Sequence, residues 1–258
     1  MKVTKEVITP EVAQYYLKGN VKNRRLSAKR VANLADEIKS GRWQLNGESI
    51  KFNGEKLLDG QHRLNAVVVS ELPIETLVMR GVSEDAFETI DTGKKRTGAD
   101  VLGISGEKNA AVLAASLGIV HRHENGRIKD HQSISHGELR ETLERHPGLR
   151  HSVKVYAKRN GLVQPSIAAA LHYLFSKKDA RIADEFFQKL LTGCDLAPGD
   201  PVLALREKLM KHALSKATKL SPKAVMALVV KAWNATRRNL RLTRLYYTEG
   251  KERFPAIK

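Results

Sequence analysis

Residues 49–64 of the 258-residue chain read SIKFNGEKLLDGQHRL, and they combine the signals of two strands, a turn and a helix. Apolar and polar side chains alternate along residues 49–52, as in a strand with one buried face. The Asn-Gly pair at 53–54 is a strong hairpin turn, and residues 55–58 return as the partner strand. The polar run at 61–63 then opens a helix. The stretch therefore predicts a β-hairpin that leads directly into a helix.

The sequence on both sides of this hairpin predicts short strands and helices. Thr9 and Ser27 stand where helix N-caps are expected, and Pro10 follows Thr9 at the first helical position. The expected elements are strands at 3–8 and 74–79, and helices over 12–17, from 27 to 41, from 61, and over 84–90.

From residue 107 onward the pattern is helical, with Pro and Gly between the helical segments. The tail at 240–257 is either a strand or a coil that packs back. We therefore expect an α+β fold with two domains: residues 1–104 with a small mixed sheet and helices, and residues 105–258, mainly α-helical and basic. The expected helices of the second domain are 108–121, 138–145, 149–160, 166–176, 180–191, 202–213 and 223–238.

The charge is high and unevenly distributed. The chain has 45 Lys and Arg against 28 Asp and Glu, a net charge of +17. Residues 105–258 hold 28 basic and 14 acidic side chains, and residues 206–258 hold 14 basic and 3 acidic ones. Such an excess favours a polyanion, since each neutralised phosphate releases counterions. We expect DNA as the partner; a solubilising surface or contact with anionic lipid are the alternatives.

Several classes of protein are excluded or disfavoured by composition. Cys194 is the only cysteine, which excludes a disulfide framework and a CxxC site. The longest apolar stretch, near residues 110–120, is too short to cross a bilayer, and no signal-peptide core or lipidation signal is evident. We therefore expect a cytoplasmic protein with no membrane partner. The sequence leaves open whether the protein forms a homo-oligomer.

The junction between the hairpin and the following helix could hold an anion. A helix N-terminus presents unpaired N–H groups and a partial positive charge. Gly60 would let a phosphate approach the backbone, and His62 and Arg63 could donate charge-assisted hydrogen bonds to it. The alternative is ordinary capping: Asp59 caps the helix, Gly60 forms the turn, and the cations are solvated. The spacing leaves both interpretations open.

Asp59-Gly60-Gln61-His62-Arg63, followed by Ala66, resembles the signature of the ParB/sulfiredoxin fold. Members of that superfamily carry Gly-x-His-Arg or Gly-Glu-Arg-Arg where a helix opens. The basic NRRLS loop, the helix VANLADEIKSGRW and the hairpin that bears Glu48 precede it in the same order, so the resemblance covers roughly residues 5–104. The later segments DTGKKRTGADVL and KAWNATRRN resemble phage-encoded ParB-like proteins and extend it over nearly the whole chain.

The resemblance implies a nucleotide or phosphate site, and it has limits. Gln61 stands where sulfiredoxins need a cysteine, so thiol repair is excluded. Gln-His-Arg also replaces the Glu-Arg-Arg of chromosome-partitioning ParB proteins, so neither CTP preference nor a sliding-clamp cycle carries over. The implied ligand is a nucleoside triphosphate, and the implied binding residues are Gly60, Gln61, His62 and Arg63, joined by Arg24 and Arg25 from the basic loop.

Catalysis at this junction would need carboxylates. Glu48 and Asp59 flank the hairpin, and with bound Mg²⁺ they could support nucleotide hydrolysis or phosphodiester cleavage. The alternatives are a solvated loop acid for Glu48 and a helix cap for Asp59. For the whole protein, the alternatives are a non-catalytic DNA-binding module or a small-molecule kinase.

Further cations are candidates for DNA contact. Three consecutive cations precede an expected helix, and four arginines follow the apolar stripe that contains Trp233, which we expect to be a core residue. The histidines of residues 121–136 are interpreted as belonging to a solvated loop and not to a metal site. The candidate DNA-binding residues are Lys94, Lys95, Arg96, Arg237, Arg238, Arg241 and Arg244.

Overall fold

The computed structural model describes residues 1–258 except 22, 24, 84–95, 128–133, 159–161 and 215–218. Its architecture is mixed α+β, with a four-stranded mixed sheet at the N-terminus and a mostly helical region after it, which confirms the predicted fold class. The chain divides into two compact units, Met1–Lys95 and Arg96–Lys258. The sequence-based boundary lay at residue 104, but helix α4 (Gly98–Ile104) places Leu102 in the core of the second unit.

The sheet of the first unit has the strand order β1-β4-β2-β3. Strand β4 pairs antiparallel with β1 and parallel with β2, and β2 and β3 form the predicted antiparallel hairpin. The hairpin register shifts between Lys51 and Phe52, and this irregularity pairs Lys51 with Asp59. The strands are β1 (Lys2–Ile8), β2 (Ser49–Asn53), β3 (Lys56–Asp59) and β4 (Ile74–Arg80).

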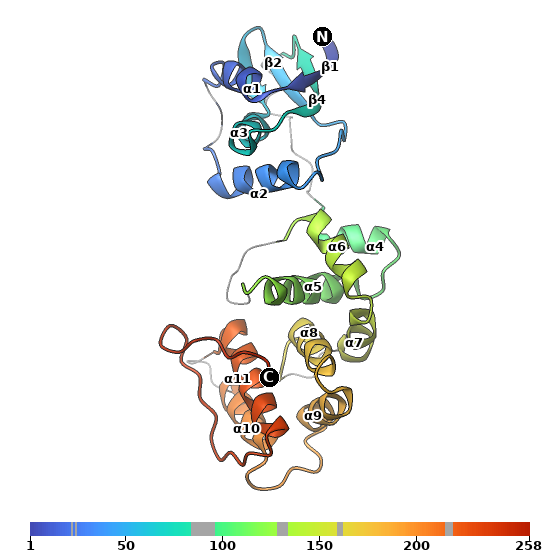
Figure 1. The fold of residues 1–258 in the computed structure, drawn as a ribbon, viewed down its shortest axis with the longest axis vertical. Coiled ribbons are helices and arrows are strands. Elements are labelled where there is room, and N and C mark those ends of the chain that lie inside the picture. The colour runs from blue at the N-terminus through green and yellow to red at the C-terminus, as the bar shows by residue number, and fades with distance from the viewer. Residues whose placement is uncertain (22, 24, 84–95, 128–133, 159–161, 215–218) are drawn as a thin grey trace. The chain divides into compact units, whose positions relative to one another are not determined.

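Three helices pack with this sheet around the core of the first unit: α1 (Pro10–Leu17), α2 (Ala28–Lys39) and α3 (Gln61–Ser70) (Figure 1). Their starts follow the predicted capping chemistry. Thr9 accepts a hydrogen bond from the backbone of the first turn of α1, and Ser27 does the same for α2. These caps fix where each helix begins, and the apolar face of α2 then lies in the core.

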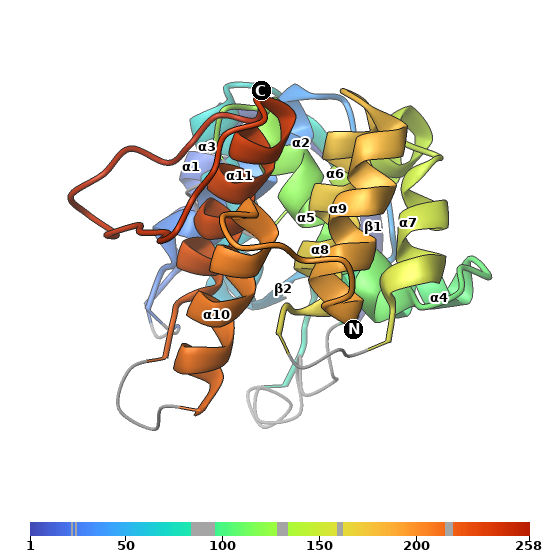
Figure 2. The same ribbon diagram turned by 90° about the horizontal axis from the view of Figure 1, so that it is seen from below.

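The second unit is a set of helices around a large apolar core (Figure 2). Trp233 lies at its centre, fully buried and stacked on Phe175 with ring centroids 4.3 Å apart, which confirms it as a core residue. The tail is the coil alternative: its Lys258 carbonyl accepts a hydrogen bond from the Trp233 indole at 3.1 Å. The remaining helices are α5 (Ala110–Glu124), α6 (His136–Arg145), α7 (Leu149–Tyr156), α8 (Pro165–Ser176), α9 (Ala180–Thr192), α10 (Pro201–Leu214) and α11 (Pro222–Arg237).

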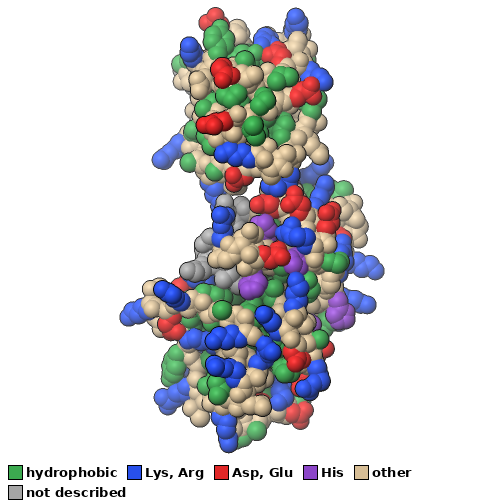
Figure 3. Space-filling model, in the orientation of Figure 1, with side chains coloured by type: hydrophobic (Ala, Val, Ile, Leu, Met, Phe, Trp, Pro, Cys, Tyr) green, Lys and Arg blue, Asp and Glu red, His purple; other side chains and the backbone are tan. Residues whose placement is uncertain are grey.

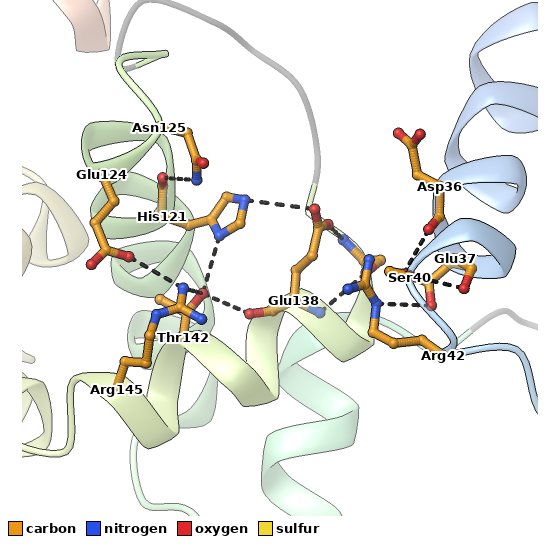
Figure 4. A network of polar contacts seen from close by, with 11 residues as sticks. Asp36, Glu37, Ser40, Arg42, His121, Glu124, Asn125, Glu138, Thr142 and Arg145 are labelled. Atoms are coloured by element: carbon orange, nitrogen blue, oxygen red, sulfur yellow. Dashed lines mark hydrogen bonds and ion pairs between the residues drawn. The ribbon is translucent and has the colours of Figure 1, made fainter.

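The interpretation of the histidine-rich segment as a loop is wrong for His123 and His136, because α5 continues to Glu124 and α6 begins at His136, while His131 lies outside the described residues. His121 points toward α6, where its Nδ1 lies 3.1 Å from the Thr142 hydroxyl and its Nε2 3.6 Å from Glu138 (Figure 4). His121 therefore helps to join two helices. In the part of the chain that the structure describes, no group of three or more His, Cys, Asp or Glu side chains could hold a metal ion. None of the described helices is long and apolar enough to span a membrane.

Candidate phosphate site and basic surface

The junction of β3 and α3 is built around Gly60. This residue is the N-cap of α3, has φ 109°, and offers no side-chain cap to the first turn. A Cβ atom here would lie 3.1 Å from Cγ1 of Ile50. The glycine is therefore required by the backbone conformation and by packing against β2. This reason is different from the close approach of a phosphate that the sequence suggested.

Asp59 is fully engaged by its neighbours. One of its oxygens accepts hydrogen bonds from Lys51 Nζ at 3.0 Å and Arg63 Nη2 at 3.1 Å, and the other accepts the Gly60 N–H at 2.7 Å. Burial by itself would raise the pKa of Asp59, but the Lys51 hydrogen bond and the charges of Arg63 and Lys51 outweigh it and lower the pKa. Asp59 is thus an ionised partner of two cations. It does not cap the first turn of α3.

Arg63 lies between the two candidate carboxylates. Its Nη2 donates to Asp59 and to the Ser49 carbonyl at 3.0 Å, and its Nη1 lies 3.9 Å from the Glu48 carboxylate. That longer distance is within ion-pair range but beyond a hydrogen bond. Nη1 is buried with no hydrogen-bond partner, and a buried donor left unpaired costs about 1–3 kcal/mol. An anion that accepts from Nη1 would remove this cost.

Gln61 and His62 are buried, and both anchor the basic loop that precedes α2. The Gln61 amide oxygen accepts from the Asn20 side chain at 3.2 Å. The His62 Nε2 accepts from the backbone N–H of Ser27 at 3.1 Å. The two ends of the loop are therefore tied to the first turn of α3. The sequence identified Ser27 only as a helix N-cap and gave no role to Asn20 or Lys51, although a polar loop with two asparagines is a signal for such contacts.

The middle of this loop carries the other two candidates from the first unit. Asn23 holds it to the hairpin by donating to the Leu57 carbonyl at 2.8 Å. Arg25 is exposed and follows Asn23, within the segment anchored to α3. Arg24 lies outside the described residues. The loop thus presents at least one cation from a segment tied to the α3 entrance.

The contacts of Glu48 and Asp59 argue against the Mg²⁺ site predicted for them. Both oxygens of Asp59 already accept hydrogen bonds, and one of them accepts from the cationic side chains of Lys51 and Arg63. The Glu48 side chain is 66% exposed, and its carboxylate lies 3.9 Å from Arg63 Nη1. Mg²⁺ takes carboxylate oxygens that carry no competing cation, so these residues do not fit the ion in this arrangement.

The candidate DNA-binding residues of the second unit are at its surface. Arg96 is exposed and precedes the capping box of α4, whereas Lys94 and Lys95 lie outside the described residues. Basic side chains spread over the face of this unit seen in Figure 3, with acidic ones between them. Four arginines at the end of α11 and in the coil after it are all exposed: Arg237, Arg238, Arg241 and Arg244.

Two of these arginines are held by the protein, and two are not. Arg237 lies 5.7 Å from the centroid of the Trp233 ring, and Arg241 donates to the Pro198 carbonyl at 2.8 Å. The side chains of Arg238 and Arg244 make no hydrogen bond or ion pair with any residue that the structure describes. The segment therefore combines fixed and unengaged cations within a short length of chain.

Comparison with known proteins gave no match: no family model, no curated protein and no solved structure is similar to this chain.

Proposed function

We propose that this protein is a ParB-like protein that binds DNA through the exposed cations of its second unit and binds a phosphate group or nucleotide at the entrance of α3. The observation that carries the proposal is the exposed arginine segment from Arg237 to Arg244. It lies in the half of the chain that holds 28 basic and 14 acidic side chains. Side chains of this kind contact the phosphate backbone, which fixes position without reading sequence.

The phosphate site rests on Arg63. Its guanidinium is oriented by Asp59 and Ser49, and its buried Nη1 still has a hydrogen bond to donate. The start of α3 adds the partial positive charge of a helix N-terminus that has no side-chain cap. Since Gln61 and His62 hold the neighbouring loop, Arg63 and the backbone of the first turn are the groups that would contact the anion.

The DNA-binding part is tested by affinity for a labelled duplex measured across salt concentrations. The logarithm of the binding constant falls as the logarithm of the salt concentration rises, and each lost phosphate contact reduces the steepness of this fall by about 0.9. The double variant Arg238→Gln/Arg244→Gln should therefore make the slope shallower by roughly 2. The matched control, Arg140→Gln/Lys154→Gln, removes the same charge from exposed positions on α6 and α7. A slope near zero for the wild type, or equal effects of both double variants, would refute contact at the arginine segment.

The phosphate site is tested by thermal shift with ATP, ADP, CTP and GTP, each with and without Mg²⁺. Arg63→Gln should remove the stabilisation by nucleotide. The control Lys51→Gln also removes a cation from Asp59 but leaves Arg63 Nη1 in place, so this variant should retain most of the stabilisation by nucleotide. Absence of any nucleotide effect, or equal losses in both variants, would contradict the site.

Nucleotide hydrolysis and DNA cleavage are tested with a different variant. Glu48→Ala alters an exposed side chain, so it should leave nucleotide stabilisation intact. If the protein hydrolyses nucleotide or cleaves DNA through Glu48, this variant abolishes the reaction. A wild type that binds but catalyses neither reaction is the non-catalytic DNA-binding module, which the engagement of both Asp59 oxygens favours.

A further inference from the structure

A cavity of about 490 Å³ lies in the first unit, between the end of α1 and the turn of the β2–β3 hairpin. Its volume is within the range of small-molecule sites. The four residues of β3 separate the hairpin turn from Gly60, roughly 13 Å at the rise of a strand, so the cavity is distinct from the α3 entrance. Three aromatic and three charged side chains line it: Tyr15, Tyr16, Phe52, Lys18, Glu55 and Arg80.

The floor of the cavity is aromatic and rigidly held. The rings of Tyr16 and Phe52 meet edge to face with centroids 5.0 Å apart, and the Arg80 guanidinium lies 5.8 Å and 6.0 Å from the two centroids. Glu6 accepts hydrogen bonds from the Tyr16 hydroxyl at 2.8 Å and from Arg80 Nη2 at 3.1 Å. Movement of Arg80 would break its ion pair with Glu6, and movement of Tyr16 would break its hydrogen bonds to Glu6 and Arg80, so the floor is preorganised for a ligand.

The back of the cavity is fixed by close contact of two backbone segments. The Gly19 carbonyl accepts a hydrogen bond from the Leu57 N–H at 2.9 Å. A Cβ atom on Gly19 would lie only 2.0 Å from the Glu55 carbonyl oxygen. Only glycine allows the end of α1 to lie this close to the hairpin, and the cavity owes its shape to that approach.

The rim carries the groups that remain available to a ligand. Tyr15 is 64% exposed, and its ring centroid lies 6.1 Å from that of Tyr16 at a tilt of 50°. The Lys18 ammonium lies 5.8 Å from the Tyr15 centroid, and Glu55 is exposed in the hairpin turn. The rim therefore offers a flat π-face, a cation and a hydrogen-bond acceptor close together.

A nucleotide supplies the complement of each group. Every base has a π-face that stacks on an aromatic ring, and its phosphate pairs with a lysine. Cytosine, adenine and guanine also carry exocyclic N–H donors that a glutamate accepts. We propose that this cavity binds one unpaired nucleotide, with the base against Tyr15, the phosphate at Lys18 and the amino group of the base at Glu55. The ligand is either a free mononucleotide or a nucleotide exposed in a single strand.

The test uses the full-length protein and separates the base from the charge. Calorimetry compares AMP and CMP with ribose 5-phosphate, and fluorescence anisotropy compares a short oligo-dC strand with an abasic strand of the same length. Tyr15→Ala should weaken binding of the base-containing ligand about tenfold or more, to the level of the base-free one. Tyr15→Phe should retain it. Gln14→Ala, at an exposed position on the same helix outside the cavity, is the matched control.

Each outcome decides between the sources or rejects the site. A Tyr15-dependent advantage of oligo-dC over the abasic strand identifies single-stranded nucleic acid. The same dependence for AMP or CMP, without an advantage for the strand, identifies a free nucleotide. If neither the mononucleotides nor the strand gain from their bases, or if Tyr15→Ala matches Gln14→Ala, the inference is wrong. The duplex salt dependence does not involve Tyr15, so failure here is distinguishable from failure of DNA binding by the second unit.

Discussion

Replacing Glu6 by Gln should destabilise the first unit by an amount that depends on pH. Glu6 accepts hydrogen bonds from Arg80, Tyr16 and Thr4. The hydrogen bond from Arg80 is the largest influence on its pKa; burial opposes it, and the bonds from Thr4 and Tyr16 add to it, so the pKa falls to about 2 from an ordinary value of 4.5. The ionised carboxylate is therefore favoured by folding.

The magnitude follows from this difference in pKa. Because the pKa is lower in the folded state, the stabilisation is fully present above pH 4.5 and is lost as the pH falls to about 2. The difference corresponds to at most about 3 kcal/mol at neutral pH. The Glu6 side chain is 25% exposed and that of Arg80 40%, and screening by water reduces the expected loss to about 1–2 kcal/mol.

Urea unfolding followed by tryptophan fluorescence measures this loss. The chain has two tryptophans, Trp43 in the first unit and Trp233 in the second, so a Trp233→Phe background reports the first unit alone. Glu6→Gln should lower the free energy of unfolding by about 1–2 kcal/mol at pH 7, and the difference should fall below about half of that by pH 3. Tyr16→Phe removes the hydrogen bond that the hydroxyl donates to Glu6 and the one that it accepts from Arg80, but no charge, so it should cost less. An equal difference at pH 7 and pH 3 would refute the ionic origin of the stabilisation.

Two further predictions concern one residue in each unit. Gly60→Ala places a Cβ at φ 109° against Ile50 and should lower the stability of the first unit by about 1–3 kcal/mol in the same Trp43 assay; a loss below about 0.5 kcal/mol would contradict the packing role. Trp233→Ala empties the centre of the second core and should cost about 3–5 kcal/mol by thermal unfolding followed by circular dichroism, whereas Trp233→Phe should cost less. A stable Trp233→Ala variant would show that Trp233 does not hold the second core together.

Local signals were sufficient for most of the fold. The Asn-Gly pair predicted the hairpin correctly, although the turn lies one residue later, at Gly54–Glu55, because Asn53 ends β2 and pairs with Lys56. Thr9 and Ser27 cap the helices that they were expected to cap. Each of these depends on residues within a few positions along the chain, which is why the sequence alone predicts them. The predicted helix end at residue 121 was three residues too early. α5 continues to Glu124, whose carboxylate accepts a hydrogen bond from Arg145 on the later helix α6, a contact that neighbouring residues in the sequence do not signal.

The charge arrangement at the site could not be predicted in this way. A regular hairpin that pairs Asn53 with Lys56 would place Lys51 opposite Leu58, so its ammonium would not face Asp59. The register shift between Lys51 and Phe52 moves the pairing by one residue and brings Lys51 to Asp59. Such irregularities depend on packing around the strand and have no clear signal in these residues. The ion pair between Lys51 and Asp59 therefore could not be predicted from the sequence.

Most residues of the segment Asp59–Arg63 have structural roles that need no ligand. Gly60 is explained by its φ angle and Ile50, and Gln61 and His62 by the loop that they anchor. A motif can thus persist for the fold alone, and a loss of binding in a Gln61 or His62 variant would not separate contact with a ligand from displacement of the loop. Arg63 is different, because the fold uses its Nη2 and leaves its buried Nη1 without an acceptor. Among the side chains of this motif, Arg63 is therefore the one whose replacement tests the proposed phosphate site, and comparison with Lys51→Gln separates loss of Nη1 from loss of a cation beside Asp59.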